Sequence, residues 1–232
     1  MPRPDAQDTP ILRNHPFAAL EPEHLAQFEA VRQVQRLPAG HVLCIEGAYL
    51  TTISVILEGA AKTTRTGDRG NPHLMQLVGR NEVVGLAGLL ADGRAQATAV
   101  TVEPTVAVTV PSDAVTALLD RSAGFAAAVA RALAAEVCHG SDRVLSMAQR
   151  SVRRRIADML LHMHGTPVPG HLGRPSIPVH LKRKDIAQFV GTTPETLSRT
   201  LAEFASLGLI AADRRSIRIL DVAGLQGLER QA

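Results

Sequence analysis

Aromatic residues are scarce, because the 232 residues include no tryptophan, one tyrosine and five phenylalanines. The hydrophobic core must therefore be built from leucine, valine, isoleucine and alanine. Apolar residues still make up 45 % of the chain, which indicates a globular protein. The length allows one large domain or two small ones, each with a substantial core.

Cysteine is equally scarce, since the chain has only Cys44 and Cys138. These two residues form neither a Cys-x-x-Cys pair nor a disulfide framework. The opening stretch "MPRPDAQDTPILRNHP" lacks the apolar core of a signal peptide. No apolar run reaches the roughly 18 residues of a membrane span. We therefore expect a cytoplasmic protein without a membrane partner.

Catalytic motifs are missing as well. The sequence has no Ser-His-Asp arrangement, no metal-ligand cluster and no phosphate-binding loop. We therefore expect neither an enzyme nor a metal site.

Charge is unevenly distributed along the chain. Residues 1–120 carry 9 basic and 13 acidic residues, a net charge of −4, whereas residues 121–232 carry 16 and 9, a net charge of +7. This asymmetry favours an anionic partner for the C-terminal half, although an Arg-rich surface without a partner would have the same composition.

The N-terminal half has the residue pattern of a β protein. Residues 11–35 are expected to form short helices. From about 37 to 110, short runs rich in Val, Thr and Ile, such as "HVLCI" and "TISVILEG", are separated by glycines. Many short strands at about ten-residue spacing favour an antiparallel barrel or roll. The stretch "TGDRGNP" at 66–72 is typical of a hairpin turn.

From about residue 112 the hydrophobic period becomes helical. Small and apolar residues follow a 4-3 spacing over about three heptads, which is the pattern of a coiled-coil seam. Such a seam favours a partner helix, and the alternative is packing on the chain's own barrel. We predict a homodimer interface formed by Ala126, Ala130, Leu133, Val137, Gly140, Val144 and Met147.

Further helices follow this seam. "QRSVRRRIADMLLHMHG" predicts a second helix whose apolar face comprises Ile156, Met159, Leu160 and Met163. After a Pro/Gly-rich loop, residues 179–232 predict two or three helices and a two-stranded hairpin in "LIAADRRSIRIL".

The segment "RKDIAQFVGTTPETLSRTLAEF", residues 183–204, has the pattern of a helix-turn-helix. Gly191 provides the positive φ of a tight turn. Thr193 is a suitable N-cap, and Pro194 suits the first helical position. The first helix is expected to bury Ile186, Ala187 and Val190, and the second to bury Leu197, Leu201 and Phe204.

Opposite that buried face, Glu195, Ser198 and Arg199 point outward near the helix N-terminus. Arg can bind guanine O6 and N7 together, Glu can accept from the cytosine amino group, and Ser can bond to several base edges. We predict that these three residues contact DNA bases. The predicted phosphate contacts are Thr192, Thr193, Lys182, Arg183, Arg214 and Arg215, with Lys184 and Arg218 nearby.

With these residues, the chain as a whole resembles the CRP/FNR family of bacterial transcription regulators. The resemblance extends from about residue 14 to the end. "PAGHVLCIEG", "ISVILEGAAK" and "GRNEVVGLAGLL" resemble that family's β-roll. The E-x-x-S-R pattern of Glu195–Arg199 is similar to the FNR-type recognition helix.

The resemblance implies an α+β fold in three parts. Residues 12–124 would form an antiparallel β-roll sensor domain of the cyclic-nucleotide-binding type. Residues 125–150 would form a long dimerisation helix, and residues 151–232 a winged helix-turn-helix DNA-binding domain. It also implies a homodimer on double-stranded DNA, a TTGAT-N4-ATCAA-like palindrome and RNA polymerase as a partner.

The resemblance leaves the effector open. The cyclic-AMP type uses a glutamate and an Arg-Ser pair, whereas the matching positions here are Leu86 and Gln96-Ala97, so cyclic AMP is not expected. Two cysteines cannot hold the four-cysteine iron–sulfur cluster of FNR. The segment "GLAGLL" lacks the Cys and His of the carbon-monoxide sensor.

The remaining effector type in the family is that of the denitrification regulators, which respond to nitric oxide through haem. His15 is the candidate haem ligand, and a packing role is its alternative. An unknown small molecule, or control by protein level, would also fit. A second class of function is a cyclic-nucleotide-binding regulatory subunit that acts on a partner protein without DNA.

Overall fold

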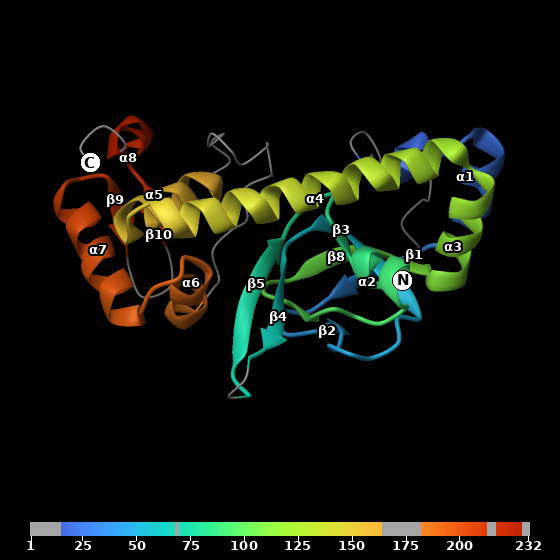
Figure 1. Ribbon diagram of the computed structural model, residues 1–232, viewed down its shortest axis with the longest axis horizontal. Coiled ribbons are helices and arrows are strands. Elements are labelled where there is room, and N and C mark those ends of the chain that lie inside the picture. The colour runs from blue at the N-terminus through green and yellow to red at the C-terminus, as the bar shows by residue number, and fades with distance from the viewer. Residues whose placement is uncertain (1–14, 68–69, 164–181, 213–216, 229–232) are drawn as a thin grey trace.

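The computed structural model describes residues 15–67, 70–163, 182–212 and 217–228. Two packed antiparallel sheets form the N-terminal domain, a long helix leads away from them, and a small helical domain follows (Figure 1). Among the described residues, no helix is long and apolar enough to cross a bilayer.

The two sheets confirm the predicted antiparallel roll. One has the order β1-β8-β3-β6 and the other the order β2-β7-β4-β5. Each contributes apolar residues to the interior, such as Ile53 and Ile56 of β3, which are fully buried. The strands are β1 (Gln33–Leu37), β2 (Val42–Cys44), β3 (Thr52–Glu58), β4 (Ala61–Thr66), β5 (Pro72–Val78), β6 (Val83–Val84), β7 (Thr98–Thr101) and β8 (Thr105–Pro111).

Helices pack around this roll. They are the 3-10 turn η1 (Pro16–Ala19), α1 (Pro22–Val31), α2 (Leu86–Ala91) and α3 (Ser112–Arg121). The expectation of short helices through residue 35 is wrong at its end, because β1 starts at Gln33. Pairing with the edge of β8, with Val34 opposite Val108, decides that conformation. The pattern of neighbouring residues could not predict this strand, because the pairing partner is distant in the sequence.

The long helix α4 (Ala123–Gln149) confirms the predicted helical period, with 27 residues. It begins at Ser122, whose hydroxyl accepts a hydrogen bond from the Phe125 N–H at 3.1 Å. Phe125 and Val129 near its start are buried against the roll. Figure 1 shows the rest of α4 running along the molecule to the C-terminal domain.

The C-terminal domain contains α5 (Val152–Met163), α6 (Arg183–Phe189), α7 (Pro194–Ser206), β9 (Ile210–Ala212), β10 (Ile217–Ile219) and α8 (Val222–Gly227). Ile156, Met159 and Leu160 of α5 are buried, as predicted. The predicted hairpin is the antiparallel pair β9–β10. The Pro/Gly-rich loop that precedes α6 lies outside the described residues.

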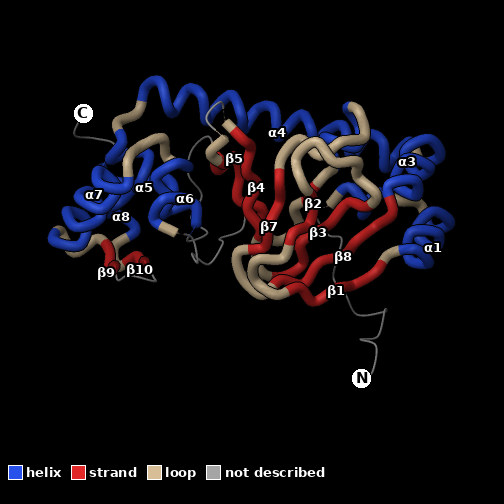
Figure 2. Tube along the Cα trace, turned by 90° about the horizontal axis from the view of Figure 1, so that it is seen from below, coloured by secondary structure: helices blue, strands red, loops and turns tan. Residues whose placement is uncertain are grey.

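The two domains share one hydrophobic cluster. Ala60, Leu74 and Leu77 of the roll belong to the same buried cluster as the core of the C-terminal domain. Helix α6 packs against β5, and Figures 1 and 2 both show α6 next to that end of the sheet. The helix-turn-helix is therefore docked on the roll.

Candidate DNA-binding interface

The turn between α6 and α7 has the conformation that the sequence predicts. Gly191 has a φ of +66°, which side-chain-bearing residues adopt at a cost. The Thr192 N–H donates to the Ala187 carbonyl at 2.9 Å and closes the turn. Ala187 is buried between the helices, where its small side chain permits their close approach.

The start of α7 is fixed by its cap. The Thr193 hydroxyl accepts a hydrogen bond from the Thr196 N–H at 3.3 Å, and Pro194 occupies the first turn. The predicted inner residues Leu197, Leu201 and Phe204 are at most 3 % exposed. The orientation of α7 is thus set by its buried face.

This orientation exposes Glu195, Ser198 and Arg199 together. The Ser198 hydroxyl donates to the Pro194 carbonyl at 2.8 Å, which leaves its oxygen lone pairs for an external donor. Hydrogen bonds from its own backbone N–H and from the Thr193 hydroxyl lower the pKa of Glu195. The three side chains therefore present an anionic acceptor, a hydroxyl and a guanidinium on one face.

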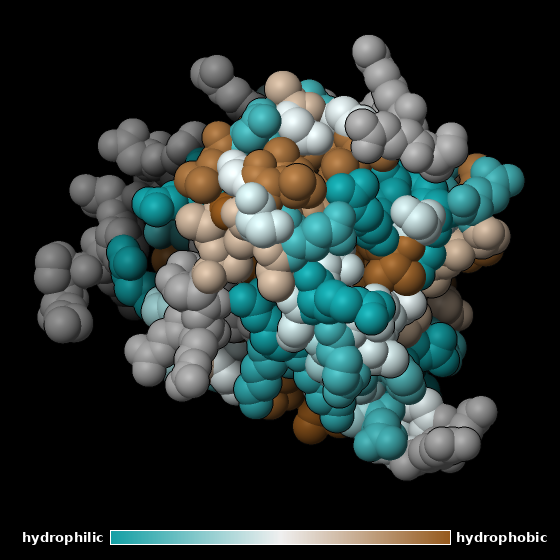
Figure 3. Space-filling view, turned by 90° about the vertical axis from the view of Figure 1, so that its left-hand side faces the viewer, coloured by the Kyte–Doolittle hydropathy of each residue, from teal (hydrophilic) through white to brown (hydrophobic). Residues whose placement is uncertain are grey.

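Basic residues lie near this face. Lys182 and Lys184 are exposed at the start of α6, whereas Arg183 is half-buried and has a partner within the protein. Arg218 is exposed on β10. Arg214 and Arg215, the other predicted phosphate contacts, lie outside the described residues. Figure 3 looks onto this end, and hydrophilic residues dominate its lower part, where Figure 1 places α7.

Three arginines of the "RSVRRR" run, residues 150–155, form ion pairs with acids of α5 and α7. Arg150 and Arg154 both bind Asp158 of α5, at 2.6 and 2.7 Å. Arg153 pairs with Glu203 of α7 at 2.9 Å. These ion pairs join the end of α4 to α5, and α5 to α7, so the run stabilises the C-terminal domain.

Two contacts that the sequence did not indicate connect the roll to the helix-turn-helix. Lys62 of β4 forms an ion pair with Asp185 of α6 at 2.6 Å. Gln188 donates to the Pro72 carbonyl at 3.2 Å. Their members are more than 100 residues apart in sequence, and no local pattern marks either pair.

The predicted dimer seam divides into two parts. Val137 and Val144 are 70 % and 69 % exposed, and Ala130 and Gly140 are also exposed. Leu133 instead packs on the core of the chain's own roll, and Ala126 is half-buried. A straight helix drifts about 20° per heptad from a 3.5-residue repeat. The exposed face of α4 therefore also includes Leu145 and Cys138.

Met147, the last seam residue, has a different environment. It is 41 % exposed, and its sulfur lies beside the turn glycine of the helix-turn-helix. It also lines a cavity between the two domains.

A second cavity, of about 410 Å³, lies between the roll and α4, and we call it the sensor cavity. Its wall includes Leu86, Gln96 and Ala97, the positions at which a cyclic-AMP site needs an acid and an Arg-Ser pair. Arg94 does not replace the missing cation. Its guanidinium stacks on the Tyr49 ring at 3.9 Å and donates to the Gly47 carbonyl at 2.8 Å.

His15 is 5 % exposed and belongs to an aromatic cluster. Its ring stacks on Phe17 at 5.1 Å, and its Nδ1 accepts a hydrogen bond from the Phe17 N–H at 3.3 Å. Burial lowers its pKa to about 4. Only Nε2 could ligate a metal, and that atom is buried without a partner among the described residues. Within the described ranges, no group of three His, Cys, Asp or Glu side chains could hold a metal ion.

Two family models match this architecture. The cyclic nucleotide-binding domain matches residues 34–122, and the Crp-like helix-turn-helix domain matches residues 154–228. A roll of this type joined by a long helix to such a helix-turn-helix defines a class of DNA-binding transcription regulators. The chain belongs to the CRP/FNR family of that class.

Similar proteins support this assignment. A CRP-like cAMP-activated global transcriptional regulator of Mycobacterium tuberculosis is 26 % identical over 88 % of this chain and 92 % of its own. The transcriptional activator FnrA of Stutzerimonas stutzeri is 23 % identical over 86 % and 82 %. The solved structure of FixK2 from Bradyrhizobium japonicum has a TM-score of 0.73 at 20 % identity, covering 87 % of this chain and 99 % of that one, and shares its fold.

Proposed function

We propose that this protein is a cytoplasmic transcription regulator that binds an FNR-type palindrome, TTGAT-N4-ATCAA or close to it, as a homodimer. The observation that carries the proposal is the exposed face formed by Glu195, Ser198 and Arg199, held by a capped and buried α7. Arg199 would bind guanine, Glu195 would accept from a cytosine amino group, and Ser198 would bond to a neighbouring base edge.

Phosphate contacts would fix the register of α7 in the major groove. Thr192 and Thr193 lie next to its N-terminus, where the N–H groups of its first turn are also available, and Lys182 is exposed at the start of α6. Arg183 is half-buried, so its share in this contact would be smaller. Arg214 and Arg215 remain proposed contacts of the segment between β9 and β10.

A palindromic site requires a two-fold dimer. The exposed apolar face of α4, centred on Val137 and Val144, is the proposed interface. A solvent-facing stripe of this length on one helix normally packs against a partner. RNA polymerase is proposed as a further partner of the DNA-bound dimer.

The test is a mobility-shift titration at several salt concentrations with the palindrome and a scrambled duplex of equal length. The palindrome is expected to bind at least about 1,000-fold more tightly than the scrambled duplex, with affinity for both falling as salt rises. Equal affinity for the two duplexes would contradict the proposal. It would favour the alternative, a cyclic-nucleotide-binding subunit that acts on a protein partner without DNA.

The effector is proposed not to be cyclic AMP, although the Mycobacterium tuberculosis relative is described as cAMP-activated. The residues at the phosphate position, Gln96 and Ala97, carry no charge. Arg94 is engaged by Tyr49 and Gly47, and Arg65, which also lines the cavity, pairs with Glu46 at 3.6 Å. A buried phosphate without a counter-charge is costly.

Nitric oxide acting through haem is a second proposal for the signal, with His15 as the candidate ligand. The surroundings of His15 fit haem poorly, because Nδ1 is occupied and the ring is stacked on Phe17. Ligation through Nε2 would require this aromatic cluster to open. The test is reconstitution with haem: a stoichiometric Soret band that shifts with nitric oxide and is altered in His15→Ala would support it, and its absence would exclude it.

A further inference from the structure

A cavity of about 360 Å³ lies at the joint between the two domains. We call it the joint cavity. Its wall is formed by β5, α4, α5 and α6, and it meets the sensor cavity at Met75, Gln76, Glu136 and His139, which line both. Its size falls in the range of cavities that enclose small organic ligands.

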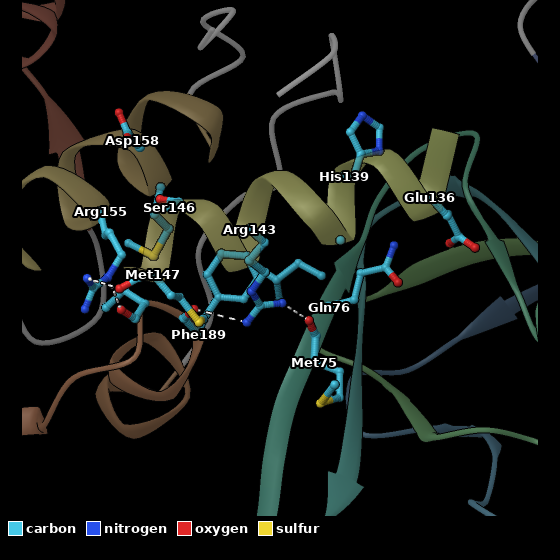
Figure 4. A pocket seen from close by; sticks show the side chains of 14 residues that line it. Met75, Gln76, Glu136, His139, Arg143, Ser146, Met147, Arg155, Asp158 and Phe189 are labelled. Atoms are coloured by element: carbon cyan, nitrogen blue, oxygen red, sulfur yellow. Dashed lines mark hydrogen bonds between the residues drawn. The ribbon is translucent and has the colours of Figure 1, made fainter. Parts of the chain in front are cut away.

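Arg143 and Arg155, from different helices, both line the joint cavity. Figure 4 shows Arg143 of α4 between β5 and α6, and Arg155 of α5 next to the helix-turn-helix. Arg143 donates to the Met75 and Phe189 carbonyls, the latter at 3.1 Å, and lies 4.4 Å from the centroid of the Phe189 ring. Arg155 is held by four backbone carbonyls, those of Val190 at 2.8 Å, Gly191 at 3.2 Å, Arg150 at 2.6 Å and Met147 at 3.4 Å.

Neither guanidinium has a carboxylate partner among the described residues. Both are half-buried, and their hydrogen-bond acceptors are neutral carbonyls. Asp158, an acid in the cavity wall, is already bound by Arg150 and Arg154. Glu136 is exposed and lies at the far end of the cavity in Figure 4. Buried positive charge of this kind is costly unless it is neutralised.

Apolar side chains form much of the remaining wall, beside the polar Gln76, His139 and Ser146. They are Met75, Leu77, Met147, Met159, Phe189 and Val190. Thioether and aromatic side chains of this kind accommodate an irregular hydrophobic body. The cavity therefore combines a site for a negative group with a site for an apolar one.

We propose that the joint cavity binds a small organic anion with an apolar body, a carboxylate or a phosphate monoester, with Arg143 binding its charge. Such a ligand would bind best where β5, α4, α5 and α6 converge as they do here. It would therefore stabilise the docked arrangement of the helix-turn-helix. This inference concerns binding alone and is tested without DNA.

The experiment is isothermal titration of the full-length protein with two probes, octanoate as the carboxylate and AMP as the phosphate monoester. One of them is expected to bind at one site per chain. Arg143→Gln removes one charge, and Ser146→Leu fills the joint cavity while leaving both arginines in place. Each is expected to weaken binding at least about tenfold.

Two controls locate the site. Arg131→Gln removes an exposed charge from the same helix, and Ala97→Leu narrows the sensor cavity instead. Both are expected to leave the affinity unchanged. Saturation by octanoate alone, or by AMP alone, identifies the negative group. If neither probe binds at millimolar concentration, or if Ser146→Leu binds as tightly as the wild type, the proposal is overturned.

Discussion

Arg199 is the residue on which sequence specificity is expected to depend most. It is exposed beside Glu195 and Ser198, and no carboxylate within the described residues forms an ion pair with it. Arg199→Ala should remove a bidentate guanine contact worth about 1–3 kcal/mol. Affinity for the TTGAT palindrome should fall, whereas affinity for random DNA should change little.

Arg218→Ala is the matched control, because Arg218 is an exposed arginine of β10 that we place against phosphate. It should weaken binding to both kinds of DNA about equally. The same is expected of Arg214→Ala. An Arg199→Ala variant that lost both affinities to the same degree would show that Arg199 contacts phosphate and not a base.

His15 predicts a pH dependence of folding stability. Its pKa is about 4 in the folded protein, because burial disfavours the charged ring, and 6.5 in the unfolded chain. The folded pKa is the lower one, so the contribution is fully present above pH 6.5 and is lost as the pH falls from 6.5 to 4. The loss should be about 3 kcal/mol.

Chemical denaturation at a series of pH values measures this loss. His15→Asn retains a side-chain acceptor for the Phe17 N–H but cannot be protonated, and should flatten the profile between pH 6.5 and 4. A variant profile as steep as that of the wild type would assign the acid sensitivity to other groups.

At the scale of elements, α4 has two faces with different roles. Phe125 and Val129 belong to the roll, and Val137 and Val144 face solvent. Val137→Glu should place two like charges near the proposed two-fold axis while leaving the core intact, so sedimentation should show a monomer. Leu133→Glu is a poorer test, because Leu133 packs on its own roll and its loss would destabilise the monomer as well.

Thr116→Glu is the control for Val137→Glu, since Thr116 is exposed on α3, away from α4's outer face. It should stay dimeric and keep operator affinity. If the Val137→Glu protein sediments as a dimer, the dimer interface lies elsewhere on the surface.

Between elements, the Lys62–Asp185 pair links β4 to α6. Both side chains are mostly buried, at 23 % and 15 % exposure, so solvent screens the pair less than a surface ion pair. A double-mutant cycle with Lys62→Met and Asp185→Asn should give a coupling free energy of about 1 kcal/mol in urea unfolding. A coupling energy near zero would show that the apolar cluster alone docks the two domains.

At the scale of the whole molecule, the proposed effector would act on the arrangement of the two domains. A ligand that binds two arrangements equally well does not shift the equilibrium between them. Millimolar cyclic AMP is expected to change neither the thermal midpoint nor operator affinity, because the sensor cavity has no cation at Gln96 and Ala97. A tight ligand at a hundredfold its Kd would add about 2.7 kcal/mol of stability. A clear upward shift of Tm with cyclic AMP would contradict our account of that cavity.

The sequence by itself determined the local elements of the DNA-binding module. The turn at Gly191, the cap at Thr193 and the outward position of Glu195, Ser198 and Arg199 follow from φ preference, capping chemistry and the 100° helical step. The antiparallel roll was also predictable, because short β-branched runs between glycines have few other stable arrangements. These features depend on residues that are neighbours in the chain.

Only the tertiary structure decided how the parts meet. β1 is a strand because β8 offers it an edge, and Leu133 turns inward because α4 drifts relative to a strict heptad. Lys62 reaches Asp185, and Arg143 bridges β5 and α6, across separations of 123 and about 50 to 70 residues. Such contacts depend on where whole elements pack. No periodicity or spacing in the sequence encodes them locally, and the joint cavity exists only because of them.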